Sequence, residues 1–254
     1  MSRTSLLSRH MRPYTHTLHV VTSGYTQPHV KINLSDLAQS DIMMWRAFTL
    51  LLIANPTRLS RTMESFRPQT AEYCIKHDAS LTGLDVGLYR LLDSSLVTFT
   101  ALDIPFAVTT ESKRQNTMEF LAVILGLLLA WRSNIRSFHY HLHGDSISSL
   151  AWAKADRVNS TLARRANIVF TTISLHLEAT IAETVHIPGK LNTIFDGLSR
   201  GLAPSELGLD TALLYNAATD VGILQLILLC NPSRELTDMS SHTDLLRQCT
   251  SLLT

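Results

Sequence analysis

The sequence has few cysteines, little net charge and no apolar run of membrane length. Its 254 residues include three cysteines, and 22 lysines and arginines stand against 21 aspartates and glutamates, for a formal net charge of +1. Three widely separated cysteines argue against a disulfide framework or a zinc cluster and are typical of a reducing, intracellular compartment, cytoplasm or nucleus. The charge balance excludes a protein that binds nucleic acid through a large positive charge.

The most apolar stretch, "MEFLAVILGLLLAW", runs from Met118 to Trp131 and holds a single acid, Glu119. A membrane helix needs about 20 consecutive apolar residues, and Arg132 follows this run directly. The N-terminus also lacks an apolar signal segment. We therefore expect a buried helix and no membrane partner.

The remaining composition, 45% apolar and 17% charged, predicts a globular fold. Periodicity and turn residues predict strands at 71–80, 84–92, 95–102, 137–143 and 179–189, and helices at 112–134, 145–155, 160–177 and 192–201. The opening hairpins imply antiparallel pairing, and the later crossovers imply parallel pairing. The sequence thus predicts an α/β fold with a mixed five-stranded sheet and helices packed on it.

Three regions follow from this order. Residues 1–66 are predicted to be a helical segment, 67–202 the α/β domain, and 203–254 a helical tail with no assigned role. The two outer regions are therefore expected to be helical extensions of the domain.

Four acids fall at or near the ends of the central elements: Asp78, Glu119, Asp145 and Asp196. Converging carboxylates repel one another unless cations lie between them. Carboxylate oxygens suit hard ions such as Mg²⁺ or Mn²⁺. Two such ions about 4 Å apart can activate a water molecule and stabilise the leaving oxygen in phosphodiester hydrolysis.

Each acid also has a simpler explanation. Glu119 suits the third position of a capping box with Asn116 as N-cap, Asp78 suits a turn, and Asp145 suits the N-cap of the next helix. Asp196 interrupts the apolar face of "IFDGL" and is the hardest to explain in this way. Taken as a set, the four acids favour a metal site over coincidence.

Three alternating histidines, His139, His141 and His143, share one face of a predicted strand. They suit a row of metal ligands, but a sheet face half covered by a helix is the preferred interpretation.

Four short strings carry a family resemblance. They are "HDAS", "QNTMEFLA", "HGDS" and "HIPGKLNTIFDGLSRG". In order and rough spacing they are similar to a ribonuclease H domain, and the last resembles the ending of retrotransposon ribonuclease H domains. Upstream, "INLSDLAQSDIMMW" resembles the segment that joins the polymerase thumb to that domain in DIRS-like elements. The resemblance covers roughly residues 10–202.

The resemblance implies a ribonuclease H-like fold and hydrolysis of the RNA strand of an RNA–DNA hybrid, with the polymerase portion of a reverse transcriptase polyprotein as a partner. It implies that two Mg²⁺ (or Mn²⁺) ions are held by the four acids. Asp78 and Asp145 would bridge the ions, and Glu119 and Asp196 would complete their coordination. The positions that match hybrid-contacting residues are Ser80, Asn116, Ser146, Lys190, Asn192 and Arg200.

Several positions depart from the family pattern. His77 replaces a threonine, Asp85 a small residue and Phe195 an alanine, while His186 is a poor match for the mobile histidine of many relatives. The chain has no polymerase Tyr-x-Asp-Asp motif, so it is not a complete reverse transcriptase. An inactive, retroelement-derived nucleic-acid-binding or structural domain remains an alternative, as does another nuclease of the same superfold.

Overall fold

The computed structural model describes residues 33–35, 38–39, 41–43, 45–46, 49, 53, 70–106, 112–155, 163–231 and 242–253. The segment 1–66 therefore lies mostly outside the described residues, although its described positions from 38 to 53 are helical. One of them, Asp41, is fully buried, and its carboxylate lies 2.9 Å from Nη2 of Arg164. This ion pair holds the upstream segment against the domain.

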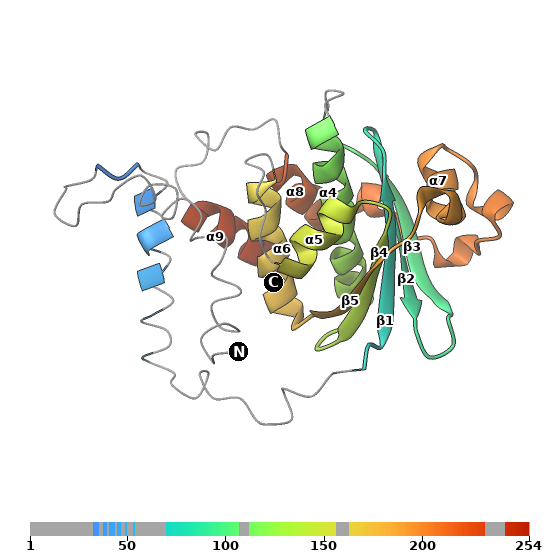
Figure 1. The fold of residues 1–254 in the computed structure, drawn as a ribbon, viewed down its shortest axis with the longest axis horizontal. Helices are drawn as coiled ribbons and strands as arrows, with labels where there is room; N and C mark the ends of the chain where they lie inside the picture. The colour runs from blue at the N-terminus through green and yellow to red at the C-terminus, as the bar shows by residue number, and fades with distance from the viewer. Residues whose placement is uncertain are drawn as a thin grey trace.

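The strands are β1 (Tyr73–Ala79), β2 (Gly83–Arg90), β3 (Leu96–Asp103), β4 (His139–Gly144) and β5 (Thr180–His186). They form one sheet in the order β3-β2-β1-β4-β5 (Figure 1). The pairs β1/β2 and β2/β3 are antiparallel, while β1/β4 and β4/β5 are parallel. The prediction of a mixed five-stranded sheet with helices packed on it is confirmed.

The helices are α4 (Ser112–Arg132), α5 (Ile147–Ala155), α6 (Arg164–Leu177), α7 (Thr193–Ser199), α8 (Val221–Leu229) and α9 (His242–Leu253). Short 3-10 turns are η4 (Gly189–Leu191), η5 (Pro204–Leu207), η6 (Thr211–Leu213) and η7 (Ala217–Thr219). Figure 1 shows α4, α5 and α6 on one side of the sheet and α7 on the other. The two sides differ in character, and this difference positions the site.

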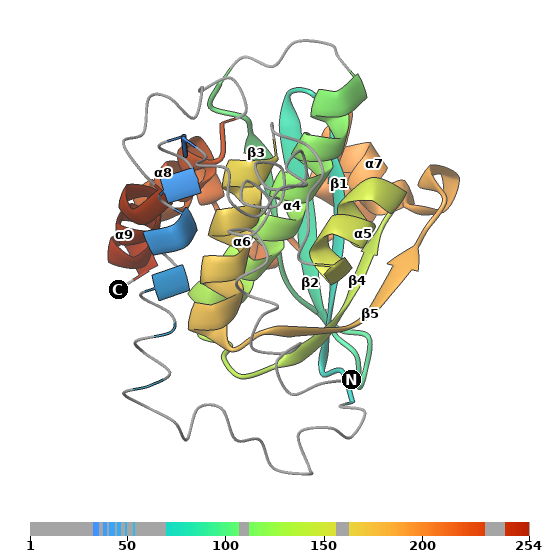
Figure 2. The same cartoon turned by 60° about the vertical axis from the view of Figure 1, so that its left-hand side comes forward.

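Helix α4 is the centre of the core, and every residue from Thr117 to Ala130 is buried. Apolar residues occur all around α4, because the sheet covers one side of the helix and α6 and α8 cover the other (Figure 2). Leu84, Val86 and Leu88 of β2 alternate toward it. No helix within the described residues is long and apolar enough to cross a membrane.

The opposite side of the sheet is covered only in part. Helix α7 packs there against β1 and β2, with the rings of Phe195 and Tyr89 in an edge-to-face contact at 6.4 Å between centroids. Phe195, which departs from the family pattern, is thus a core residue of this second, smaller cluster.

The described part of the tail packs on the domain. Leu214 forms a bridge beside Phe99 of β3, and the hydroxyl of Thr100 donates to the carbonyl of Tyr215 at 2.7 Å. Arg132 at the end of α4 makes a two-pronged contact with Asp220, with both distances 2.6 Å. Figures 1 and 2 place α8 and α9 beside α4 and α6. The described residues of the predicted tail therefore cover this side of the core.

Candidate metal centre

The site begins where β1 ends in a tight hairpin. Asp78 is the last residue but one of β1, and it lies directly opposite Asp85 of β2. The hydroxyl of Ser80 accepts the backbone N–H groups of Gly83 at 2.8 Å and Thr82 at 3.2 Å. Ser80 therefore fixes the turn that follows the first acid.

Three of the four predicted acids come together. Ligand oxygens of Asp78, Glu119 and Asp145 all lie within 4.8 Å of one another, and no other such group of three or more histidine, cysteine or acidic side chains occurs among the described residues. Asp78 and Asp145 meet because β1 and β4 are adjacent and parallel, so their carboxyl ends share one edge of the sheet. Helix α4 crosses that edge and adds Glu119.

The electrostatics of this group favour a cation. Burial, followed by the charges of Glu119 and Asp145, raises the pKa of Asp78 to about 6, against smaller opposing effects of Ser199 and of His77. Within the described residues, no lysine or arginine forms an ion pair with any of the three acids. Like charges this close need a counter-ion, and three carboxylates suit a hard divalent cation.

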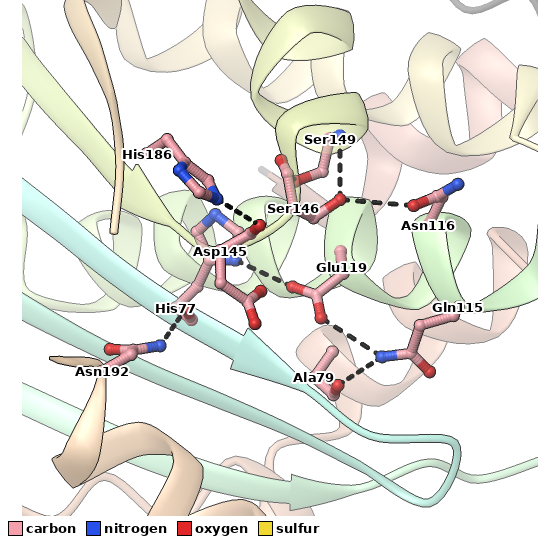
Figure 3. A network of polar contacts seen from close by, with 10 residues as sticks. All are labelled: His77, Ala79, Gln115, Asn116, Glu119, Asp145, Ser146, Ser149, His186 and Asn192. Carbon is pink, nitrogen blue, oxygen red and sulfur yellow. Dashed lines mark hydrogen bonds and ion pairs between the residues drawn. The ribbon is translucent and has the colours of Figure 1, made fainter. Parts of the chain in front are cut away.

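Two neighbouring side chains face the carboxylate of Glu119. The Nε2 of Gln115 donates to Oε1 of Glu119 at 3.2 Å and to the carbonyl of Ala79 at 2.6 Å. The Nδ1 of His77 lies 3.5 Å from the other carboxylate oxygen, Oε2. Figure 3 shows these groups around the carboxylate. Both oxygens of Glu119 thus face a polar atom of the site.

The capping-box interpretation of Glu119 is wrong. Helix α4 begins at Ser112, so Asn116 lies inside the helix and Glu119 lies beyond its first turn. The residues between are lysine, arginine and glutamine, which extend helices readily and carry the start one turn upstream. Glu119 is therefore free of a capping role.

Asp145 follows β4, and it does not cap α5 as the simpler interpretation proposed. Helix α5 begins at Ile147, and the hydroxyl of Ser146 accepts the N–H of Ser149 at 3.2 Å, which makes Ser146 the cap. The Nε2 of His186 lies 2.9 Å from the carbonyl of Asp145. A Cβ at Gly189, the first residue of η4, would come within 3.2 Å of the Asp145 carboxylate, so a larger residue there would require a small shift of that carboxylate.

Asp196 has a different environment. It lies on α7, and its carboxylate pairs with Arg200 of the next turn, at 2.9 Å from Nη2 and 3.0 Å from Nε. It does not belong to the group of three acids. The same helix still reaches the site, because Ser199, whose hydroxyl donates to the carbonyl of Asp196 at 3.0 Å, lies near enough to Asp78 to lower its pKa.

The positions matched to hybrid contacts differ in exposure. Lys190 and Arg200 are exposed, whereas Asn192 is buried and donates from Nδ2 to the carbonyl of His77 at 3.1 Å. Asn116 and Ser146 are partly exposed and lie 3.4 Å apart, between Oδ1 and Oγ. Asn192 thus has a contact inside the domain, while the others lie at or near the surface around the acids.

The alternating histidines point away from α4, since Tyr140 and Leu142 occupy the buried positions of β4. His141 and His143 stack at 6.1 Å between ring centroids, and both are partly exposed. Their face of the sheet is the one that α7 covers only at β1 and β2. This supports the preferred interpretation of a partly covered sheet face.

Several residues of the site had no sequence signal of their own. Gln115 lies one helical turn before Glu119, and Ser199 lies three residues after Asp196; such spacings mark neighbours only once the acids are known. Asp85 stood out as a departure from the family pattern. It is 2% exposed, and burial, together with Asp78 and Asp103, raises its pKa to about 8.

No protein-family model and no curated protein matches the chain. Similar solved structures include ribonuclease H1 of the archaeon Halobacterium salinarum NRC-1, with 17% identity over 50% of this chain and 91% of that chain, and a TM-score of 0.38.

Two further solved structures have TM-scores of 0.40. The N-terminal ribonuclease H domain of rv2228c from Mycobacterium tuberculosis, fused to maltose binding protein, has 16% identity over 51% of this chain and 97% of that chain. LC11-RNase H1, isolated from compost by a metagenomic approach, has 15% identity over 54% of this chain and 99% of that chain. At these identities and TM-scores, any statement about activity depends on the site residues.

Proposed function

We propose that this protein is a metal-dependent ribonuclease H of the retroelement type, which hydrolyses the RNA strand of an RNA–DNA hybrid. The observation that carries the proposal is the convergence of Asp78, Glu119 and Asp145 within 4.8 Å at one edge of the sheet. No lysine or arginine of the described residues neutralises them. The arrangement is costly without a cation and suited to hydrolysis with one.

The three acids would hold Mg²⁺ or Mn²⁺, and Asp196 would complete the set for two ions. When bound, the ions lower the pKa of water and stabilise the leaving oxygen of the phosphodiester. Gln115 orients Glu119 through its hydrogen bond to Oε1. Because Asp196 is 39% exposed at its side chain and is paired with Arg200, it would join the site by exchanging a surface ion pair, which costs little.

Selection of a hybrid would come from side chains around the acids. An A-form-like helix presents 2′-hydroxyl groups across its shallow minor groove, and Ser80, Asn116 and Ser146 offer neutral polar groups at the site rim. Exposed Lys190 and Arg200 offer charge for phosphates. Asn192 would act indirectly, by fixing the backbone of His77.

The retroelement assignment depends on "HIPGKLNTIFDGLSRG" and on the upstream "SDIMMW" string. It implies that the polymerase portion of a reverse transcriptase is the natural partner. The burial of Asp41 against Arg164 is consistent with a close association between the upstream segment and the domain.

The test is cleavage of an RNA–DNA hybrid labelled on each strand, in Mg²⁺ and in Mn²⁺. We expect loss of the RNA strand only, with Asp78→Asn inactive. Asp93→Asn is the control, since Asp93 lies on the exposed turn after β2. Equal cleavage of both strands, or full activity of Asp78→Asn, would refute the proposal.

A second candidate function is that of a catalytically inactive, hybrid-binding or structural domain. The specific observation in its favour is the Asp196–Arg200 ion pair, which leaves three acids in the group instead of four. Hybrid binding at a fixed stoichiometry without turnover in either metal would support this function over the enzyme.

A further inference from the structure

His77 occupies an unusual place next to the acids. It immediately precedes Asp78 on β1, it is fully buried, and its Nδ1 lies 3.5 Å from Oε2 of Glu119. Neither ring nitrogen of His77, nor Oε2 of Glu119, has a hydrogen-bond partner among the described residues. Buried polar atoms without partners are rare and call for an explanation.

The position of the ring is fixed by packing. Gly144, the last residue of β4, lies so close that an added Cβ would come within 2.5 Å of both Cε1 and Nε2 of His77. The backbone is held as well, because Asn192 donates to the His77 carbonyl at 3.1 Å. The ring of His77 thus lies against Gly144 and faces the carboxylate of Glu119 (Figure 3).

His77 is thus a neighbour of each of the three acids, or of the residue beside it. It is the chain neighbour of Asp78, it faces the carboxylate of Glu119, and its ring lies against the residue before Asp145. Repulsion from Asp78 and Asp145 pushes the Glu119 carboxylate away from the group. Gln115 engages one oxygen of that carboxylate, and His77 faces the other.

We propose that His77 is a positioning residue that holds Oε2 of Glu119 toward the cation site. This inference rests on the proposed metal site and names a residue of this chain that tunes it. A polar partner of a carboxylate ligand orients the ligand without touching the ion, and loss of such a partner typically costs about 10- to 100-fold in metal affinity.

The experiment compares variants of the full chain by calorimetric titration with Mn²⁺ alone. His77→Phe keeps a ring over Gly144 but removes both nitrogens, and we expect its dissociation constant for Mn²⁺ to rise about 10- to 100-fold. His77→Asn restores a polar atom near the place of Nδ1 and should recover part of the affinity. In a cleavage assay, His77→Phe should need more Mn²⁺ for half-maximal rate, with the rate at saturating Mn²⁺ changed less.

The matched control is His141→Phe. His141 also faces a glutamate, with Nε2 at 3.8 Å from Oε2 of Glu183, but on the other face of the sheet. Its Mn²⁺ affinity should equal that of the wild type. If His77→Phe does not fold, His77→Leu and His77→Asn make the same apolar-to-polar comparison.

The outcomes separate this inference from the proposed function. Wild-type affinity in His77→Phe, or no recovery in His77→Asn, overturns the inference even if the protein cleaves hybrids. A weakened affinity that His77→Asn partly restores supports it even if no hybrid is cleaved. A wild-type chain that binds no Mn²⁺ overturns it as well.

Discussion

Two sets of acids in this protein, one of three carboxylates and one of a single carboxylate, are stabilised in opposite ways. Asp78, Glu119 and Asp145 converge within 4.8 Å and have no lysine or arginine partner among the described residues. Asp196, on helix α7, has its own cation in Arg200 at 2.9 Å. The first set requires an external charge, whereas the second is already neutralised at the surface.

This difference teaches which acids depend on a bound ion. A buried like-charge group is unstable until a cation or a proton is supplied, and the raised pKa of Asp78 reflects that strain. An exposed ion pair one helical turn apart contributes little to stability. Substitutions in the two sets should therefore have very different consequences.

The largest expected effect is on catalysis. Asp145→Asn removes an acid of the convergent set and should lower hybrid cleavage by more than about 100-fold, since partners of metal ligands alone cost about 10- to 100-fold. Asp196→Asn should cost less, because Asp196 is not in that set. Single-turnover cleavage of a labelled hybrid measures both, and equal losses would remove the distinction between the two sets.

The next effect is on stability in the presence of metal. Mn²⁺ at about 100 times its dissociation constant should stabilise the wild type by about 2.7 kcal/mol, which raises the Tm by several degrees. Asp78→Asn should abolish this rise, while Asp196→Asn should keep part of it. Thermal unfolding followed by circular dichroism, with and without EDTA, gives the comparison; a metal effect unchanged in Asp78→Asn would contradict it.

A third prediction concerns Asp85. Its pKa of about 8 in the folded protein lies above its ordinary value of 3.8, so folding retains a proton that the unfolded chain releases between about pH 4 and pH 8. Stability should fall as pH rises through that window. Asp85→Asn cannot ionise and should be more stable than the wild type at pH 9, by several kcal/mol, but not at pH 4.

Urea unfolding at several pH values measures the Asp85 effect. Asp103→Asn is a useful control, since Asp103 is exposed and contributes only the smallest of the three causes of the Asp85 shift. If the stability gained by Asp85→Asn at pH 9 persists at pH 4, ionisation of the Asp85 carboxyl group is not the cause of that gain.

The smallest effect is expected at Arg200. Arg200→Met removes the ion pair with Asp196 on an exposed helix end, and the free energy of unfolding should change by less than about 0.5 kcal/mol. Urea unfolding measures it. A loss of several kcal/mol would mean that the second set of charges is also part of the core.

Much of this could be read from the sequence. The alternation in "SFHYHLH" and the apolar run after Glu119 predict β4 and α4, and the four acids with their surrounding strings predict the site. The helix predicted at 112–134 begins at Ser112 as expected, but the simpler interpretation of Asn116 as its N-cap was wrong, because capping signals are local and the preceding residues extend a helix equally well. Asn192 matched a hybrid-contacting position of the family but is buried, and its burial depends on tertiary packing that no local pattern records.

Local sequence patterns specify which elements form and which acids lie near their ends, because hydrophobic period and turn residues act over a few neighbours. The convergence of Asp78, Glu119 and Asp145, and the separate pairing of Asp196 with Arg200, result from tertiary packing. This packing also placed the His77 ring between Glu119 and Gly144. These arrangements depend on how β1, β4 and α4 pack together, and contacts between segments far apart in the chain have no local sequence signature.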